Sequence, residues 1–343
     1  MSDTLILDQP DDWHVHLRDG AALSITVNAT ARHFARAIVM PNLARPVTTV
    51  ELAEAYRARI LANLDTGLRF EPLMTLYLTD RTSPEEIKRA ADSDIVKACK
   101  LYPAGATTNS DSGVTSMGAI ESVLQAMQDC DLPLLVHGED TQPSIDVFDR
   151  ENAFIQKSLT PLVQRYPKLR VVFEHITTAE AVEFVQGTRA GVAATLTPQH
   201  LLMNRNDLFI GGLRPHNYCL PLLKRRNHQE ALQRAATSGD PRFFLGSDSA
   251  PHAQNAKESA CGCAGCYSAP YALSLYAHFF ESMGALDCLE PFASHFGADF
   301  YGLSRNSAKL SLKREAQNVP EQLPYLDEQA IIPYWAGRRL EWQ

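Results

Sequence analysis

The stretch DWHVHLRDG, residues 12–20, follows an apolar opening segment and carries a cluster of polar side chains. In a β-strand, residues i and i+2 point to the same face, so His14 and His16 lie together and Arg18 comes next along that face. Two imidazoles that converge on one point provide half of a metal site. A histidine pair on a solvated strand is the alternative interpretation, and the rest of the chain has to decide between the two.

Seven further runs of apolar and β-branched residues have the character of strands, with helical patterns between several of them. Apolar residues in the helical stretches recur at three and four positions, as in helices that pack on a sheet. This alternation predicts an α/β protein with parallel strands and crossover helices. Eight units predict a (β/α)8 TIM-like barrel, and periodicity alone leaves a doubly wound sheet as the alternative. The strand runs are residues 11–17, 36–42, 70–80, 95–103, 132–139, 169–177, 191–200 and 242–252, and the helical stretches are residues 48–64, 117–130 and 228–239.

The part of the chain after the eighth run completes this prediction. Residues 268–303 are expected to be helical, and residues 304–343 to form short strands and loops that close over the barrel. Because no linker composition interrupts the pattern, we predict that residues 1–343 form a single domain.

Composition narrows the class of protein. With 45% hydrophobic and 21% charged residues, the chain is typical of a globular protein. A net charge of −8 without a long basic cluster argues against a nucleic-acid partner. The opening residues lack the basic segment of a signal peptide, and no apolar run reaches the roughly 18 residues that a membrane helix needs. Seven cysteines in a chain of this size predict reduced thiols, and therefore a cytoplasmic protein.

Chemically active side chains fall near the ends of the strand runs. In a barrel of this kind the active site lies at the C-terminal ends of the strands, whereas purely structural histidines and lysines would be scattered. We therefore predict that these residues form one site. They are His14, His16, Asn42, Lys100, His137, His175, His200 and Asp248.

The ligand count indicates two metal ions. Four histidines and one carboxylate are too many for one tetrahedral zinc with an open position, but suit a two-metal hydrolytic site. Lys100 is open to two interpretations. It is either an ordinary lysine that extends its ammonium to solvent, or a neutral amine that takes up carbon dioxide and becomes a carbamate with the charge and shape of a carboxylate.

Six segments, in this order and spacing, closely resemble the dihydroorotase family, shorter bacterial type, of the amidohydrolase superfamily. They are DWHVHLRD, MPNL, KLYPAGATTNS, LLVHGE, FEHITT and LGSDSAPH. The resemblance extends from Asp11 to beyond Tyr301. It implies an enzyme that interconverts N-carbamoyl-L-aspartate and L-dihydroorotate, the ring-closing step of pyrimidine biosynthesis.

The resemblance also implies a role for each site residue. His14 and His16 would bind one zinc ion, His137 and His175 a second, and a carboxylated Lys100 would bridge them. Asp248 would bind the first zinc and shuttle the proton. The substrate carboxylate would be held by Arg18, Asn42, His252 and the backbone of Ala264, and the backbone of Leu220 would meet the ring amide. The implied substrate-contacting set, which includes two of the metal ligands, is His16, Arg18, Asn42, His137, Leu220, His252 and Ala264. A homodimer is implied as well.

Residues 102–116, YPAGATTNSDSGVTS, are rich in small polar residues and lack an apolar period, which predicts a mobile surface loop directly after Lys100. The resemblance implies a lid with Thr107 and Thr108 at its tip. A plain connector is the alternative. The segment of residues 201–227 is longer than an ordinary loop, which favours a function for it.

Two alternatives to this function remain open at this stage. Another cyclic-amide hydrolase, such as a hydantoinase or an allantoinase, would share the metal ligands but need not present Arg18, Asn42 and His252 to a carboxylate. A catalytically dead scaffold on the same fold would lack activity despite a complete set of ligands.

For the CGCAGC segment and the remaining histidines we predict supporting, structural or surface roles. The CGCAGC segment could supply a structural zinc site through Cys261, Cys263 and Cys266, with Cys219 as a fourth ligand. Its spacing lacks the paired C-x-x-C of a zinc knuckle, so we predict a glycine-rich loop that brings the Ala264 amide to the substrate. His200 is expected to support the site from behind or to be structural. Surface or packing roles are predicted for His33, His228, His278 and His295.

Overall fold

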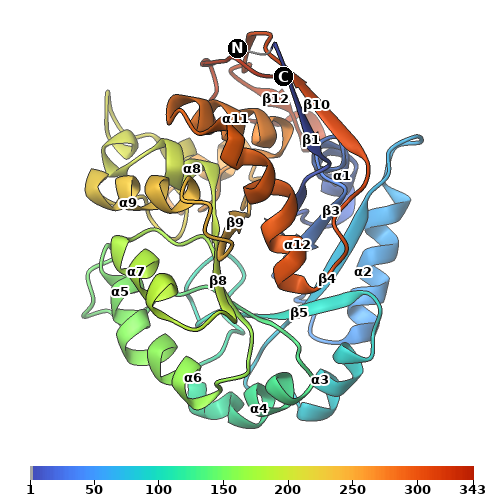
Figure 1. The fold of residues 1–343 in the computed structure, drawn as a ribbon, viewed down its shortest axis with the longest axis vertical. Coiled ribbons are helices and arrows are strands. Elements are labelled where there is room, and N and C mark those ends of the chain that lie inside the picture. The colour runs from blue at the N-terminus through green and yellow to red at the C-terminus, as the bar shows by residue number, and fades with distance from the viewer. Residues whose placement is uncertain (1–2) are drawn as a thin grey trace.

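The computed structural model describes residues 3–343, and its centre is a ring of eight parallel strands (Figure 1). Each strand pairs with the next in chain order. Beyond the last strand, the Asp248 N–H donates to the His14 carbonyl (2.8 Å) and the His16 N–H donates to the Ser249 carbonyl (3.0 Å), so the chain returns to the first strand. The predicted barrel is confirmed. Its strands are β2 (Asp11–Val15), β3 (Arg36–Val39), β4 (Glu71–Tyr77), β5 (Val96–Leu101), β6 (Leu134–Val136), β7 (Val171–Phe173), β8 (Val192–Leu196) and β9 (Phe243–Leu245).

Most of the helices surround this ring (Figure 1). Several begin where the sequence supplies an N-cap, because a hydroxyl there accepts a hydrogen bond from a free N–H of the first turn. Thr49 caps α2 in this way, and Ser83 caps α3, where Pro84 follows. The helices are α1 (Leu23–Ala31), α2 (Val50–Ala62), α3 (Pro84–Ala91), α4 (Glu121–Asp129), α5 (Arg150–Phe154), α6 (Thr160–Arg165), α7 (Ala179–Gly187), α8 (Pro198–Leu202), α9 (Arg226–Ala236), α10 (Gln254–Lys257), α11 (Ala272–Ser282) and α12 (Phe296–Tyr301).

Apolar side chains fill the inside of the barrel, as this fold requires. Helix α12 packs against this interior cluster, where the Tyr301 ring stacks on Trp13 with ring centres 4.7 Å apart. Gly297 makes the approach possible, because a Cβ there would lie 2.0 Å from the Trp13 ring nitrogen. The interior is therefore a packed core, and a site can form only at the strand ends. The strand residues of the cluster are Trp13, Ile38, Leu73, Ala98, Leu135, Val172, Ala193 and Phe244.

An irregularity in β2 determines where the two N-terminal histidines lie. Trp13 packs inside the barrel whereas Val15 packs in the outer core, although strict alternation would place both side chains on one face. The pairing of β2 with β3 shifts register between Asp12 and Val15. Such a shift turns the strand locally and redirects its side chains. His14 and His16, on either side of Val15, reach the same site.

A strand near the N-terminus pairs with a strand that follows the barrel helices, a pairing that was not predicted from the sequence. β1 (Thr4–Asp8) lies antiparallel to β10 (Lys309–Lys313), beside each other in Figure 1. The rest of the C-terminal tail consists of short strands and loops, as predicted. Its Tyr334 N–H donates to the Tyr267 carbonyl (2.8 Å), so the tail packs on the segment that follows the barrel. The remaining strands are β11 (Gln317–Asn318), β12 (Leu323–Pro324), β13 (Ala330–Ile331) and β14 (Arg339–Leu340).

The predicted strand runs are longer than the strands that form, and at the seventh run the excess belongs to a different element. The seventh barrel strand, β8, ends at Leu196, and Pro198 starts the short helix α8 that contains His200. Thr197 caps this helix, and proline is favoured in the first turn because its missing N–H is not needed there. His200 therefore lies in a helix after the strand instead of at the strand end. None of the helices in residues 3–343 could cross a membrane.

Candidate active site

The first predicted ligand group comes together between the end of β2 and the turn after β9. His14 Nε2 lies 3.4 Å from His16 Nε2 and 3.4 Å from Asp248 Oδ1, and His16 Nε2 lies 3.1 Å from the same oxygen. Two imidazole nitrogens and one carboxylate oxygen at such spacing can hold one metal ion. His14 and Asp248 are buried, and the His16 side chain is 10% exposed.

A buried carboxylate orients His14. The His14 Nδ1–H donates to Glu174 Oε2 (2.8 Å), and the Thr195 hydroxyl donates to the same oxygen (2.6 Å). This contact selects the tautomer that leaves His14 Nε2 free to bind a metal. Burial acts to raise the pKa of Glu174, but His14 and Lys100 outweigh burial and lower it. Glu174 is therefore held as a carboxylate behind the site.

The second predicted group lies next to the first. The His137 ring centre is 4.9 Å from that of His175, which in turn is 5.0 Å from that of His14. Glu139 Oε2 accepts a hydrogen bond from His137 Nε2 (2.8 Å), so Nδ1 is the nitrogen of His137 that remains for a metal. Burial lowers the pKa of His175 well below its usual value, and Lys100 adds to this effect. A neutral imidazole is the form that binds a metal.

Lys100 lies on β5 and is completely buried. Within the residues described, its Nζ has no hydrogen-bond partner, and it stands 5.3 Å from the centre of the Tyr102 ring. Burial lowers the pKa of Lys100 to about 8, although Glu174 and Asp248 oppose the shift. A buried, unpaired ammonium is costly, because it has lost water without gaining a partner. The interpretation of Lys100 as a solvated surface lysine is wrong.

Three site residues have a backbone conformation that is unusual for any residue except glycine. The φ angles of Arg18, His175 and Asp248 are 61°, 41° and 45°. A non-glycine residue at positive φ is strained, by about 1–3 kcal/mol, and such residues concentrate at functional sites. Each follows the end of a barrel strand, so the strain accompanies the turn that aims the side chain across the ring.

A second cluster faces the same space from the loops. Arg18 Nε donates to the Pro251 carbonyl (3.0 Å), and its Nη2 donates to His252 Nε2 (2.8 Å). The same His252 nitrogen lies 3.0 Å from the Ala264 carbonyl oxygen, and one tautomer can serve only one of these two contacts. Burial, together with Arg18, lowers the pKa of His252 to about 2, so this imidazole is neutral. The cluster thus presents one arginine charge to the space above the metal ligands.

The 102–116 loop reaches over this space. Asn42 Nδ2 donates to the Thr108 carbonyl (3.0 Å), and Asn109 Nδ2 donates back to the Asn42 carbonyl (3.0 Å). At the base of the loop, the Val114 N–H donates to the Tyr102 carbonyl (2.8 Å). The loop is therefore held over the site in this conformation; its mobility stays a prediction.

One pocket collects most of the predicted side chains. Lys100 and His252 do not line this pocket, but each contacts a lining residue: Lys100 faces the Tyr102 ring, and His252 accepts a hydrogen bond from Arg18. Sequence analysis missed three lining residues, Tyr102, Ala250 and Gly265, and also the supporting carboxylates Glu139 and Glu174. The two carboxylates stand in the quoted segments LLVHGE and FEHITT, beside a predicted ligand, which was the signal for them. The lining residues are His14, His16, Arg18, Asn42, Tyr102, Thr107, Thr108, His137, His175, Leu220, Asp248, Ala250, Ala264 and Gly265.

His200 does not line this pocket. Its Nε2 donates to the Pro221 carbonyl (2.9 Å), and its Nδ1 accepts from the Thr197 hydroxyl (2.7 Å). It thereby ties α8 to the chain next to Leu220, which fits a supporting position. All seven cysteines are free thiols.

The four histidines with predicted surface or packing roles lie away from the pocket. His33 Nε2 contacts the Pro270 carbonyl, His228 Nδ1 accepts from the Ala179 N–H, and His295 pairs with Asp8. His278 packs its ring near Trp335.

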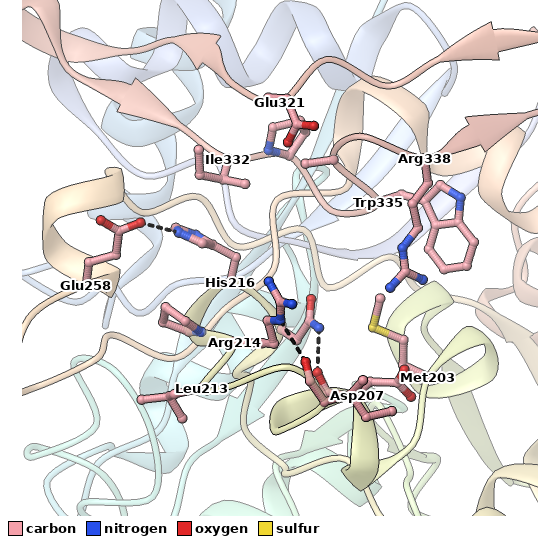
Figure 2. A pocket seen from close by; sticks show the side chains of 15 residues that line it. Met203, Asp207, Leu213, Arg214, His216, Glu258, Glu321, Ile332, Trp335 and Arg338 are labelled. Atoms are coloured by element: carbon pink, nitrogen blue, oxygen red, sulfur yellow. Dashed lines mark hydrogen bonds and ion pairs between the residues drawn. The ribbon is translucent and has the colours of Figure 1, made fainter.

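A separate hollow of about 760 Å³ lies between the long 201–227 segment and the C-terminal tail. Figure 2 shows the side chains that line it. Its lining includes Arg214, His216 and Trp335 but none of the predicted site residues. His216 Nε2 pairs with Glu258 Oε1 across one side of this hollow (2.9 Å). The long segment thus contributes Leu220 to the active-site pocket and a different stretch to this second hollow.

Comparisons with known proteins agree with this geometry. The model of the amidohydrolase family matches residues 5–320. The chain therefore belongs to the amidohydrolase family, whose fold places a metal site at the strand ends of a barrel. Within that family it belongs to the dihydroorotases, which are metal-dependent cyclic-amide hydrolases.

The assignment to the dihydroorotases rests on relatives that match this chain along their whole length. A dihydroorotase of Stutzerimonas stutzeri is 61% identical over 343 residues, which is 100% of this chain and 99% of the relative. One of Acinetobacter baylyi is 57% identical over 341 residues, 99% of each chain. The crystal structure of a Campylobacter jejuni dihydroorotase superposes with a TM-score of 0.91 at 35% identity, covering 100% of this chain and 98% of the other.

A solved structure of a more distant enzyme shares the fold alone. An L-hydantoinase of Arthrobacter aurescens has a TM-score of 0.81 at 17% identity, and covers 99% of this chain and 82% of the other.

Proposed function

We propose that this site interconverts N-carbamoyl-L-aspartate and L-dihydroorotate with two bound zinc ions. His14, His16 and Asp248 would hold one ion and His137 and His175 the other, with a carboxylated Lys100 between them. The observation that carries the proposal is the convergence of two histidines and a carboxylate within 3.4 Å, beside a buried lysine without a partner.

The chemistry of the donor set supports this assignment. Lys100 Nζ is fully buried and unpaired, and a positive ammonium there would oppose any cation bound nearby. A carbamate on the same nitrogen would reverse that charge and supply two oxygen ligands. His175 Nδ1 is also buried without a partner. The residues present therefore fit a two-metal centre.

Bound zinc ions would supply Lewis acidity for an amide carbonyl and make water acidic enough to attack at neutral pH. The chain's own residues supply the rest. Asp248 would take the proton of the attacking water and return it to the leaving ring nitrogen, which is general base and general acid catalysis by one carboxylate. In the cyclisation direction the same proton moves the opposite way.

Arg18 would bind the carboxylate of the substrate. A guanidinium can bind a carboxylate through two parallel hydrogen bonds, and Arg18 lines the pocket with its Nη2 held by His252. Asn42, His252 and the Ala264 backbone would complete this carboxylate site, and the Leu220 backbone would meet the ring amide. A relative from Saccharomyces cerevisiae, 34% identical with a TM-score of 0.91 over 99% of this chain and 98% of its own, was solved in complex with 5-fluoroorotic acid. This supports a ring carboxylate as the feature that the pocket binds.

Metal analysis and one activity assay test the proposal. The purified protein should contain close to two zinc ions per chain and should hydrolyse L-dihydroorotate in a spectrophotometric assay. His137→Ala should lose mainly one ion. One metal ion in the wild type and no change in His137→Ala would contradict the two-metal proposal.

We also propose, on the family resemblance, a cytoplasmic homodimer of single-domain subunits. Light scattering of the purified protein would test the dimer. A monomer at micromolar concentration would rule it out.

A further inference from the structure

Lys257, at the end of α10, has an environment that the proposed mechanism does not use. Its side chain is only 4% exposed. Nζ donates to three backbone carbonyls: Tyr218 (2.9 Å), Cys263 (3.0 Å) and Gly265 (2.5 Å). Three N–H donors exist only on the ammonium, since a neutral amine has two. In the described chain no ion pair involves this lysine, and besides the three carbonyls its Nζ faces the Tyr218 ring, 6.0 Å from the ring centre.

The three carbonyls belong to two segments that both line the active-site pocket. Tyr218 stands two residues before Leu220, while Cys263 and Gly265 flank Ala264 on either side. The two segments also touch directly, because the Gly265 N–H donates to the same Tyr218 carbonyl (3.0 Å). Lys257 therefore lies at the junction of the two backbone stretches that are proposed to contact the substrate.

The geometry of the peptide group links this lysine to the pocket. The Cys263 carbonyl and the Ala264 N–H belong to one planar peptide group, and in the trans form they point in opposite directions. A cation that holds the carbonyl on one side thus aims the N–H toward the other side. The positive charge also polarises the peptide group, which makes the N–H a stronger donor to an anion.

The backbone around Ala264 has little freedom to adjust if the contacts of Lys257 are lost. The Ala250 N–H donates to the Cys266 carbonyl (2.8 Å), which fixes the segment to the turn after β9. A Cβ on Gly265 would lie 2.7 Å from the Ala250 carbonyl oxygen, so the backbone is already in close contact there. Directly after α10, Glu258, the residue that follows Lys257, pairs with His216 (Figure 2).

We propose that Lys257 is a positioning residue that orients and polarises the Ala264 N–H toward the carboxylate of the substrate. This inference rests on the proposed function, because the carboxylate at Ala264 is part of it. The substrate carries this carboxylate before, during and after the reaction. Weaker binding of the carboxylate therefore affects the ground state and the transition state alike. Such uniform binding appears in KM and leaves kcat unchanged.

Steady-state kinetics and calorimetry on zinc-loaded enzyme test the role. Lys257→Met keeps the length of the side chain and removes all three donors. We expect KM for L-dihydroorotate to rise by about tenfold, with kcat within about threefold of wild type. The dissociation constant of orotate, measured by isothermal titration calorimetry as a probe that carries the ring carboxylate, should rise by a similar factor. Zinc content should be unchanged.

Lys224→Met is the matched control. Lys224 is also a buried lysine (5% exposed), and its Nζ donates to the Leu222 carbonyl (2.8 Å) rather than to the carbonyls that flank Ala264. We expect this variant to lose stability and to keep the wild-type KM. Equal KM changes in both variants would contradict a specific role for Lys257.

A second variant covers poor folding of Lys257→Met. Lys257→Gln keeps two N–H donors without the charge, and we expect KM to rise by at least about threefold. An unchanged KM and orotate affinity in the folded Lys257 variants, with only a smaller active fraction, would overturn the proposal. Failure of the proposed function itself would look different, because the wild-type enzyme would then not turn over L-dihydroorotate at all.

Discussion

The active-site pocket has two walls, and they are built in different ways. The strand-end wall consists of His14, His16, His137, His175 and Asp248, which lie at or after the ends of barrel strands, with Lys100 of β5 buried behind them. The loop wall consists of Thr107, Thr108, Leu220, His252 and Ala264. The first wall is oriented by buried carboxylates such as Glu174 and Glu139, and the second by hydrogen bonds to backbone carbonyls.

The difference follows from what each wall has to hold. Metal ions require ligand atoms at fixed distances, and the barrel provides them because its strands are locked on both sides by neighbours. A substrate must enter and leave, so its contacts come from loops that a scaffold positions. Changes in the strand-end wall should therefore remove metal and turnover, whereas changes in the loop wall should weaken substrate binding with the metal still in place.

The largest effect is expected at Lys100, the residue shared by both proposed metal ions. Lys100→Ala should lose metal, and its activity should fall to background. A short carboxylic acid added to the solution should partly restore both, by filling the space of the bridging carbamate. Metal analysis and the dihydroorotate assay check this. An unmodified amine at Lys100 in the active, metal-loaded enzyme, seen by crystallography, would refute the carbamate.

Asp248→Asn should have the next largest effect. An amide cannot shuttle a proton, and general acid–base catalysis contributes about 10²–10⁴-fold to the rate. We expect kcat to fall by at least that factor, measured with zinc in excess so that weaker metal binding does not dominate. Turnover close to the wild-type value would remove Asp248 from the mechanism.

The supporting carboxylates should matter less than the ligands that they orient. Glu139→Gln keeps the size of the side chain but removes the charge that holds His137 Nε2. Partners of this kind typically change metal affinity by about 10–100-fold. Competition with a chelator would measure the loss, and Glu174→Gln should behave similarly through His14. Unchanged zinc affinity in both variants would show that the barrel alone orients the imidazoles.

The smallest effect is expected in the loop wall. Replacing both Thr107 and Thr108 by alanine should lower kcat/KM by about tenfold, or roughly 1.4 kcal/mol of transition-state stabilisation. A lid that excludes water strengthens the attraction between charged groups beneath it. Zinc content should stay at the wild-type level, which distinguishes this wall from the other. Wild-type kinetics in the double variant would make the loop a simple connector.

The two walls also differ in how far the sequence predicted them. Parallel strands bring their C-terminal ends to one edge, so histidines at the ends of separate runs could be assigned to one site before any coordinates. His14, His137 and His175 are examples. The prediction worked less well where chain beyond a strand folds differently, as at His200, which the capping residue Thr197 places in a helix.

Contacts between segments far apart in the chain could not be predicted from the sequence. Nothing around Lys257 in the sequence indicates that its ammonium binds the carbonyl of Tyr218, 39 residues away. The pairing of β1 with β10 joins a strand near the N-terminus to one that follows the barrel helices, and neither strand alone specifies its partner. The register shift in β2 could not be predicted either, because alternation places Trp13 and Val15 on one face, whereas they pack in two different clusters.

The sequence by itself thus determined the class of fold and the identity of the metal-ligand candidates, because hydrophobic periodicity and residue type are local properties. Only the tertiary structure decided which nitrogen of each histidine faces the site, which carboxylates orient them, and which lysine lies unpaired beneath them. These depend on distances between segments far apart in the chain. A one-dimensional pattern does not contain those distances, since packing sets them only when the barrel closes.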